Sequence, residues 1–385
     1  MRQVYFDNAA TTRVRPEVAE LMIKVMEEDY GNPSSMHGFG VRAERYVKEA
    51  AERIAASLKV SPKEIVFNSG GTEGNNNVIV GTALKRKGLG KHIISTRIEH
   101  AAVYNPLIFL ESMGYEVTFL DVDSRGHIDI EELKRSVRPD TILVSCMFVN
   151  NEMGAIEDIA SVSRTVKEIN PRTYIHTDAI QAYGKLSIRP KELGVDMLTV
   201  SGHKIHGPKG TGFIYINEKV NISPIILGGG QQRDRRSGTE NVPGIAGLGF
   251  SAEMYRREHE EINKKMLSIK DRLMDRLSEI EGVTLNSERG ELSAPHIVSA
   301  SFEGVRAEVL LHALEEKGVY VSSGSACSSN HPAISGTLKA IGVKKELLDS
   351  TIRFSFGIYN EPEEADYAAD CVEELLPVLR RFKRY

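Results

Sequence analysis

The chain has 385 residues, of which 41% are hydrophobic and 26% charged, a balance typical of a soluble globular protein. Its formal net charge of −4, without acidic or basic blocks, argues against nucleic acid or an anionic membrane as a partner. No apolar run approaches the ~18–20 residues of a membrane helix, and we see no secretory signal. The three cysteines (Cys146, Cys327 and Cys371) form no CxxC pair and no disulfide framework, so we expect a cytoplasmic protein.

Short β-rich runs alternate with amphipathic helical stretches through the first two-thirds of the chain. This alternation predicts an α/β fold with a mostly parallel sheet covered on both faces. Ligands of such sheets bind at the carboxyl ends of the strands. The predicted strands are 64–68, 92–96, 116–121, 141–148, 174–177, 197–200 and 212–216, and the helices between them include 41–57, 102–112 and 159–168.

The pattern changes near residue 250. A long, highly charged amphipathic segment at 252–280 is typical of a connecting helix. Beyond it, predicted strands at 296–302, 319–322 and 351–355 are interleaved with helices at 307–317 and 363–382. We therefore expect a large domain at residues 15–255 and a smaller α+β domain made of residues 1–14 and 256–385.

A Gly-rich turn, SGGTEGNN at residues 69–76, follows a predicted strand and opens a helical stretch. Such a turn aims backbone N–H groups and the positive end of the helix dipole at an anion. It matches neither the P-loop nor the GxGxxG pattern, so a single phosphate group fits better than a nucleotide. The alternative is an ordinary N-capped helix start.

Lys204 lies in a polar, Gly-containing turn after the run 196–200, and Asp178 ends the earlier run 174–178. In a parallel sheet these two side chains can meet at one edge. A lysine that forms a Schiff base, with an aspartate that keeps a pyridine nitrogen protonated, is what pyridoxal phosphate (PLP) chemistry requires. The alternative is a solvated lysine.

Three further polar side chains stand at predicted strand ends. His100 could stack on a pyridine ring, or it could be a surface histidine. Asn151 and Gln181 carry amides that can bind a phenolic ring oxygen without adding charge. Each of these observations is weak when taken alone.

Arg353 lies inside an apolar strand, where arginine is uncommon unless it is paired. Its planar fork suits a substrate carboxylate, and the alternative is a structural salt bridge. Cys327 lies between small polar residues, which predicts an exposed loop rather than a core position. Cys146 lies in an apolar run and is expected to be inert packing, while Cys371 on the last helix has no functional context.

Together these motifs resemble the cysteine desulfurases of the NifS/IscS type, within the class V aminotransferase-like PLP enzymes, which have the PLP-dependent transferase fold type I. The resemblance covers essentially the whole chain. Its motifs are YFDNAATT at 5–12, GNPSS at 31–35, SGGTE at 69–73, EH at 99–100, VNNE at 149–152, DAIQ at 178–181, SGHK at 201–204, RSGT at 236–239, SSGSACS at 322–328 and IRFS at 352–355.

The resemblance implies PLP as the cofactor. Lys204 is then the Schiff-base lysine and proton shuttle, Asp178 pairs with the pyridinium, and His100 stacks on the ring as a further catalytic residue. Asn151 and Gln181 reach the side of the ring hydroxyl. The residues implied to hold the phosphate are Gly71, Thr72, Ser201, His203 and, from the second subunit of a homodimer, Thr239.

The resemblance also implies that Arg353, with Asn151, binds the carboxylate of L-cysteine. Cys327 attacks the substrate sulfur, leaving alanine and a protein persulfide that supplies iron–sulfur scaffold or other acceptor proteins. No resident metal site is expected, although Cys327 can contact an iron–sulfur cluster transiently. Departures from the family include Gly71, where many relatives have alanine, and His206, which replaces a common tyrosine. Glu240-Asn241 and the loop Asn330-His331-Pro332 also differ from the family pattern.

Two other functions stay open from the sequence. One is another PLP reaction on the same fold, such as selenocysteine β-elimination or transamination, and Cys327 argues against it because neither reaction needs a nucleophilic thiol. The other is a catalytically weak PLP protein that mainly binds scaffold and acceptor proteins. The presence of Lys204, Asp178, Arg353 and Cys327 argues against that function.

Overall fold

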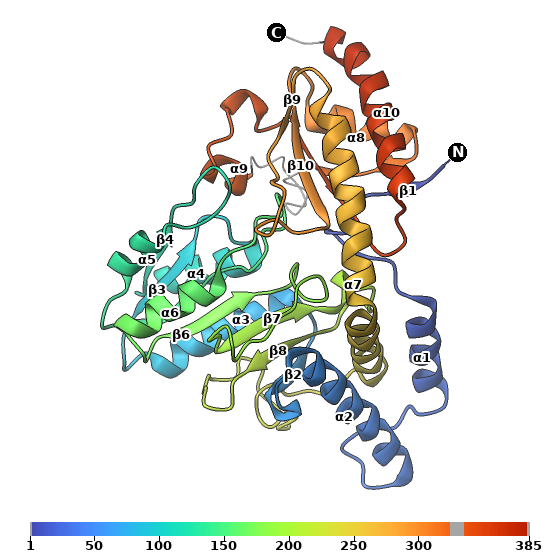
Figure 1. Ribbon diagram of the computed structural model, residues 1–385. Coiled ribbons are helices and arrows are strands. Elements are labelled where there is room, and N and C mark those ends of the chain that lie inside the picture. The colour runs from blue at the N-terminus through green and yellow to red at the C-terminus, as the bar shows by residue number, and fades with distance from the viewer. Residues whose placement is uncertain (1, 324–334, 383–385) are drawn as a thin grey trace.

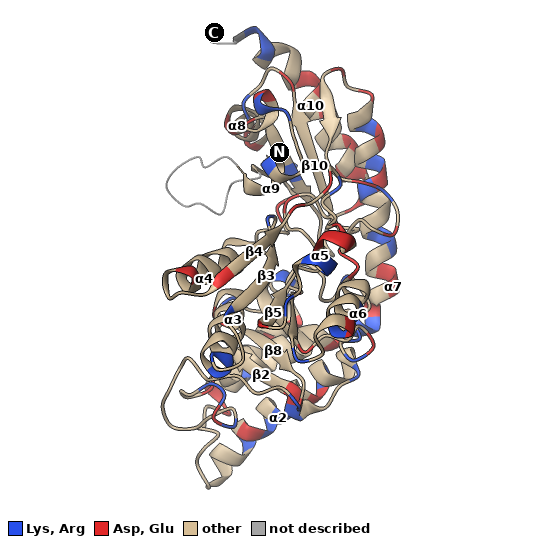
Figure 2. Ribbon diagram, turned by 90° about the vertical axis from the view of Figure 1, so that its left-hand side faces the viewer, with Lys and Arg blue, Asp and Glu red and all other residues tan. Residues whose placement is uncertain are grey.

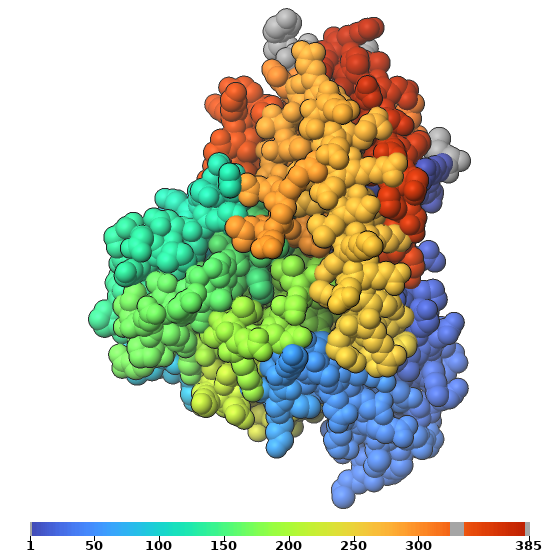
Figure 3. Space-filling model, viewed as in Figure 1, coloured from blue at the N-terminus to red at the C-terminus, as the bar shows by residue number. Residues whose placement is uncertain are grey.

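A computed structural model describes residues 2–323 and 335–382. Figure 1 shows a large α/β part, a smaller part built mainly from the C-terminal third, and the long helix α7 (Val242–Ser278) running through both. In the space-filling view of Figure 3 the C-terminal third lies against the sheet-containing part, and the N-terminal helices lie at the far end from it.

A seven-stranded sheet of order β2-β8-β7-β6-β5-β3-β4 forms the centre of the large part. Neighbouring strands from β4 to β7 are parallel, whereas β8 is antiparallel to both β7 and β2. The strands are β2 (Ile65–Asn68), β3 (His92–Thr96), β4 (Glu116–Leu120), β5 (Thr141–Ser145), β6 (Tyr174–Asp178), β7 (Met197–Ser201) and β8 (Gly212–Ile216).

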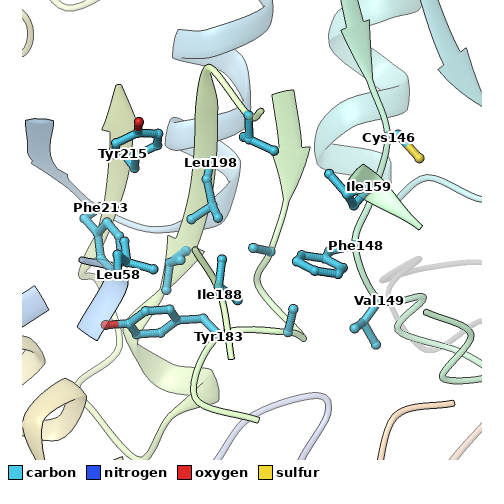
Figure 4. Packing of buried hydrophobic residues seen from close by; sticks show 14 of the residues in the cluster. Leu58, Cys146, Phe148, Val149, Ile159, Tyr183, Ile188, Leu198, Phe213 and Tyr215 are labelled. Atoms are coloured by element: carbon cyan, nitrogen blue, oxygen red, sulfur yellow. The ribbon is translucent and has the colours of Figure 1, made fainter. Parts of the chain in front are cut away.

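Successive residues of each strand pack into different cores because side chains alternate across a sheet. On β7, for example, Leu198 packs with helices α2 and α6, while Met197 packs with α3 and α4. Figure 4 shows part of the first core, which includes Leu198, and the rings of Tyr183 and Phe213 in it lie edge to face with their centroids 5.2 Å apart. The helices are α1 (Pro16–Glu27), α2 (Gly38–Leu58), α3 (Gly71–Arg86), α4 (Ala101–Ser112), α5 (Ile130–Ser136) and α6 (Ile159–Ile169).

The smaller part contains a four-stranded sheet of order β12-β13-β10-β9 and a parallel pair, β1-β11, which brings the N-terminus to it. Its core joins α8, α10 and the C-terminal half of α7. Its elements are β1 (Val4–Tyr5), β9 (Val283–Leu285), β10 (Ile297–Phe302), α8 (Ala307–Glu316), β11 (Val319–Tyr320), β12 (Ser322–Ser323), α9 (Gly336–Ala340), β13 (Thr351–Ser355) and α10 (Pro362–Leu379).

The seven strands expected in the large sheet and its mostly parallel direction are confirmed. The expected strand 141–148 is too long: β5 ends at Ser145, and the chain then crosses to Val149, which bridges Ile156. The expected helix 252–280 begins ten residues earlier, where the Asn241 side chain caps it by accepting from the Gly244 N–H. Helix α7 contributes Met266 to the core of the large part and Ile269 to the core of the smaller part, so it belongs to both. The division into two domains at residue 255 stays a prediction.

No helix in the described part of the chain is long and apolar enough to cross a membrane.

Candidate active site

A cavity of about 260 Å³ lies at the carboxyl ends of the parallel strands, where the two parts of the molecule meet. Its walls come from strand ends, from the first turns of α3 and α4, from the segment after β1, and from β13. The lining residues are Ala9, Ala10, Gly71, Thr72, His100, Ala102, Met147, Val149, Asn151, Asp178, Ile180, Gln181, Ser201, His203, Lys204 and Arg353.

Ten of the twelve site residues named from the sequence therefore line one cavity. The exposed Thr239 does not line it in this chain. Cys327 lies outside the described residues.

Lys204 ends a single 3-10 turn, η2 (Gly202–Lys204), directly after β7. Its ammonium donates to the main-chain oxygens of Ala9 and Ala10, both at 2.6 Å. The N-terminal segment thus supplies acceptors that hold the lysine amine at the cavity wall. Sequence analysis missed this role of the two alanines, because main-chain oxygens leave no residue-type signal.

Asp178 ends β6, and its carboxylate is buried beneath the cavity. Its Oδ1 accepts from the Ile180 N–H at 3.0 Å, and its Oδ2 accepts from the Asn75 amide at 2.7 Å. Burial raises the pKa of Asp178, while these donors and the nearby Lys204 charge oppose that rise. A carboxylate held in this way can stabilise a cationic ring nitrogen brought against it.

The first turn of α3 faces the cavity through Gly71 and Thr72. Its N-cap, Gly70, has φ +141° and supplies no side-chain cap for the first N–H groups of the helix. A Cβ on Gly71 would lie 2.2 Å from Cδ1 of Ile180. Ile180 therefore occupies the space that a Cβ at position 71 would need.

His203 and Ser201 lie opposite this turn. The His203 Nδ1 is 3.2 Å from the Thr11 hydroxyl, and burial together with the charges of Lys204, Lys209 and Lys185 lowers the pKa of His203 to about 3. The imidazole is therefore neutral at physiological pH. The described residues contain no group of three His, Cys, Asp or Glu that could hold a metal ion.

His100 is the N-cap of α4, and its Nδ1 accepts from the Ala102 N–H at 3.1 Å. This bond places the ring proton on Nε2 in the neutral form. The Gln181 amide is also fixed, because its Nε2 donates to the Ala9 oxygen and its Oε1 is 3.2 Å from Nε2 of His296. These bonds orient both side chains before any ligand enters.

Arg353 reaches the cavity from the middle of β13 and is 4% exposed. Its Nη1 donates to the main-chain oxygen of Asn151 at 2.8 Å, and its Nη2 donates to Oδ1 of Asp7 at 2.9 Å. The buried Nε has no hydrogen-bond partner among the residues that the structure describes. The structural salt bridge considered above therefore exists with Asp7, yet the guanidinium also lines the cavity.

The cavity residues fit PLP in their donor set. A helix start without a side-chain cap, beside Ser201 and His203, suits a phosphate, and the buried Asp178 suits a pyridine nitrogen. The amine of Lys204 lies within the same cavity, where an aldehyde could reach it.

Residues 4–367 match the family model described as aminotransferase class-V. The chain belongs to this family. It is 43% identical over 379 residues to the cysteine desulfurase IscS of Methanosarcina thermophila, covering 98% of this chain and 93% of the relative. A solved "NIFS-like protein" superposes with a TM-score of 0.93 at 40% identity, covering 98% of this chain and all of that one.

A structure described as "SspA in complex with cysteine" superposes with a TM-score of 0.82 at 33% identity, covering 93% of this chain and all of that one. The resemblance to cysteine desulfurases is thereby confirmed, and with it the PLP-dependent class and the class-V fold.

Three further residues of the site, besides Ala9 and Ala10, escaped sequence analysis. Asp7 pairs with Arg353 across 346 positions, and Asn75 donates to Asp178 across 103. Lys185 donates to the main-chain oxygen of Lys204 at 2.6 Å. Asp7 and Asn75 lay within quoted motifs, but nothing local in the sequence assigned them a contact.

Proposed function

We propose that this protein is a cysteine desulfurase that converts L-cysteine to L-alanine and transfers the sulfur to its own Cys327 as a persulfide, for iron–sulfur cluster assembly. The observation that carries the proposal is the convergence of Lys204, Asp178, His100 and Arg353 on one cavity beside the start of α3. Lysine and aspartate serve the cofactor, whereas an arginine on the opposite wall suits a carboxylate ligand.

Bound PLP would supply an aldehyde for Lys204 and a ring that withdraws electrons from the substrate. Asp178 would hold the ring nitrogen and His100 would cover the ring face. Asn151 and Gln181 would bind the ring hydroxyl side. The phosphate would be held by the N–H groups and side chains of Gly71, Thr72, Ser201 and His203, together with the second subunit's Thr239.

Arg353 would bind the substrate carboxylate. Its resting partners, Asp7 and the Asn151 oxygen, hold the guanidinium plane in place before substrate binds. The SspA structure with cysteine, from a 33% identical relative, supports the choice of L-cysteine.

Sulfur transfer would need a thiolate at Cys327. Its sulfur bonds to the substrate sulfur, the substrate C–S bond breaks with its electron pair moving to carbon, and a proton delivered by Lys204 completes the alanine methyl group. Cys146 and Cys371 are poor alternatives because both are buried, and burial raises the pKa of each thiol.

The active protein would be a homodimer in the cytoplasm. Thr239 is exposed in a single chain. The segment between α1 and α2 exposes Tyr30 and Met36, and the first turn of α2 exposes Phe39, apolar area that a second copy could cover. The two described cysteines are free thiols, which suits a reducing compartment.

The decisive experiment is sulfide and alanine release from L-cysteine by the purified holoenzyme. Lys204→Ala should abolish both products while leaving a folded dimer. Cys327→Ser should still bind L-cysteine, seen as a change in PLP absorbance, but should form no persulfide on the peptide containing position 327. Wild-type sulfide release by Cys327→Ser would instead favour a simple elimination enzyme.

A further inference from the structure

Lys185 is a buried cation that the proposed reaction does not use. It follows Gly184, whose φ is +83° and where an added Cβ would lie 2.8 Å from the Tyr255 ring. The absence of a side chain at Gly184 lets the chain pack closely against Tyr255, next to η2. The Lys185 side chain is 3% exposed, and its Nζ donates to the main-chain oxygen of Lys204 at 2.6 Å.

No carboxylate pairs with Lys185 among the residues that the structure describes. A buried ammonium without a counter-ion is costly, so its contacts with neighbouring groups dominate its behaviour. The Tyr255 ring centroid lies 5.9 Å from its Nζ. The titratable groups that face it from the surrounding elements are His203, Lys204 and His206 of the η2 segment, Tyr255 of α7, and His296 before β10.

The histidines in this group are neutral at physiological pH. Burial lowers the pKa of His203 and His206 to about 3, and that of His296 well below its ordinary value. Lys204 is therefore the one strong cation that faces Lys185 among the groups named. Burial first, and the Lys204 charge second, lower the pKa of Lys185 to about 7.

We propose that Lys185 is a positioning residue for Lys204: it anchors the main-chain oxygen of the catalytic lysine, and its positive charge favours the neutral, nucleophilic form of the Lys204 amine. The two lysines then lose their protons as a coupled pair. Asp7 and Asp178 act in the opposite direction on Lys204, because their charges favour its ammonium. The proposal rests on the proposed function of Lys204.

A neutral Lys204 matters because only a free amine can bond an aldehyde or accept a proton. A like charge nearby is one way in which enzymes keep a lysine neutral near pH 7. Lys185 supplies such a charge from outside the cavity, without occupying ligand space.

Acetic anhydride labelling of the full chain freed of PLP measures the proposal directly. The rate of acetylation at Lys204, read by mass spectrometry from pH 5 to 10, gives the midpoint at which its amine becomes neutral. Lys185→Met should raise this midpoint by up to about one pH unit, the shift expected for losing one nearby charge in a medium of effective dielectric constant ~20. The shift is smaller to the extent that Lys185, with its pKa of about 7, has already lost its own proton. Lys185→Arg keeps the charge and should leave the midpoint at or below the wild-type value.

Lys270→Met is the matched control. Lys270 is also buried, and its Nζ donates to the Ser293 hydroxyl and the Ala294 oxygen, in the smaller part of the fold. Its removal should leave the Lys204 midpoint unchanged. Equal shifts in Lys185→Met and Lys270→Met, or an upward shift in Lys185→Arg, would overturn the proposal.

If Lys185→Met does not fold, Lys185→Gln provides the neutral variant and Lys185→Arg still tests the charge. The pH titration of the holoenzyme's visible absorbance should shift in the same directions as the labelling. Borohydride reduction of the wild-type holoenzyme tests the proposed function separately from the role of Lys185. If Lys204 forms the Schiff base, the Lys204 peptide carries the added mass of the reduced cofactor, whatever the Lys185 variants do.

Discussion

Asp178→Asn tests the charge at the end of β6. The amide keeps the size of the side chain but carries no charge, and its NH₂ group would face either the Ile180 N–H or the Asn75 amide, both of which donate to the carboxylate. We expect kcat to fall by at least tenfold while PLP still binds, and holoenzyme absorbance with steady-state kinetics will measure both.

Glu157→Gln is the control for this variant. Glu157 is another buried carboxyl outside the cavity, and burial raises its pKa to about 8, so it is mostly protonated at neutral pH. Replacing it with glutamine should change neither the absorbance nor kcat. An unchanged kcat in Asp178→Asn would make Asp178 a purely structural residue.

Arg353→Lys separates substrate binding from the structural ion pair. An ammonium can hold the Asp7 carboxylate or the Asn151 oxygen, but it cannot present a planar fork to a substrate. We expect KM for L-cysteine to rise and kcat/KM to fall by about tenfold to a hundredfold.

Arg15→Lys is a suitable comparison because Arg15 is also buried, with a bidentate pair to Glu258 away from the cavity. It should lower the melting temperature without changing KM. If Arg353→Lys behaves in the same way, its ion pair with Asp7 is the whole of its role.

At the scale of elements, the packing of α2 against α7 depends on Gly249. A Cβ at this position would lie 2.5 Å from the Ala50 Cα and 2.6 Å from its Cβ, so the two helices would have to separate. Gly249→Ala should destabilise the fold by about 1–3 kcal/mol despite the higher helix propensity of alanine. Urea unfolding followed by circular dichroism will measure it.

Gly336→Ala is the matched change, since a Cβ on this helical glycine meets no atom of the described residues within 4 Å. It should be neutral or slightly stabilising. An equal fall in the free energy of unfolding in the two variants would mean that the close approach of α2 and α7 contributes nothing to stability.

Elements with a strong local pattern were predictable from the sequence. The run of β3 is rich in β-branched residues, two isoleucines and a threonine, and every residue of it is buried. Its bounds matched the prediction. The three-residue β9 was missed, because its backbone becomes a strand through pairing with β10 at the sheet edge. Local residue preferences carry little information about such a short strand.

The site was predictable wherever a residue type carries the chemistry, as for Lys204, Asp178 and Arg353. It was not predictable where distant parts of the chain meet. Lys185 follows a glycine in a turn and reads as a surface lysine, yet packing against Tyr255 buries it beneath η2. Only the folded chain reveals that contact.

At the scale of the whole molecule, α7 joins the two parts through their cores. Figure 2 shows Lys and Arg interspersed with Asp and Glu along α7 and α10, and the ion pairs between them include Arg272 with Asp366 and Arg276 with Asp370. These pairs are at the surface, where each contributes little. The apolar residues Ile269 and Leu273 of α7, both fully buried, therefore matter more for holding the smaller part together.

Buried titratable groups make the stability of this fold depend on pH in two opposite directions. His176 lies within the sheet between the hydroxyls of Ser145 and Thr199, and burial lowers its pKa to about 3. The stability that comes from keeping His176 neutral is fully present above its ordinary pKa of 6.5. It is lost as the pH falls, because the unfolded chain then binds a proton that the folded chain does not bind. Glu157, with a pKa raised to about 8, contributes most at low pH and loses that contribution as the pH rises from 4.5 to 8.

The two groups can be separated by comparing variants with the wild-type protein across pH. His176→Gln should be less stable at pH 7, and its deficit should shrink by up to about 1.4 kcal/mol for each pH unit below 6.5. Glu157→Gln should gain stability relative to wild type as the pH rises from about 5 to 8. The wild-type carboxyl stays protonated in the fold but ionises in the unfolded chain over this range, whereas the amide is neutral in both states. Urea midpoints at half-unit pH steps will measure both differences. Parallel curves for His176→Gln and wild type would show that His176 is not held neutral, and that its hydroxyl partners stabilise the imidazolium as well as the imidazole.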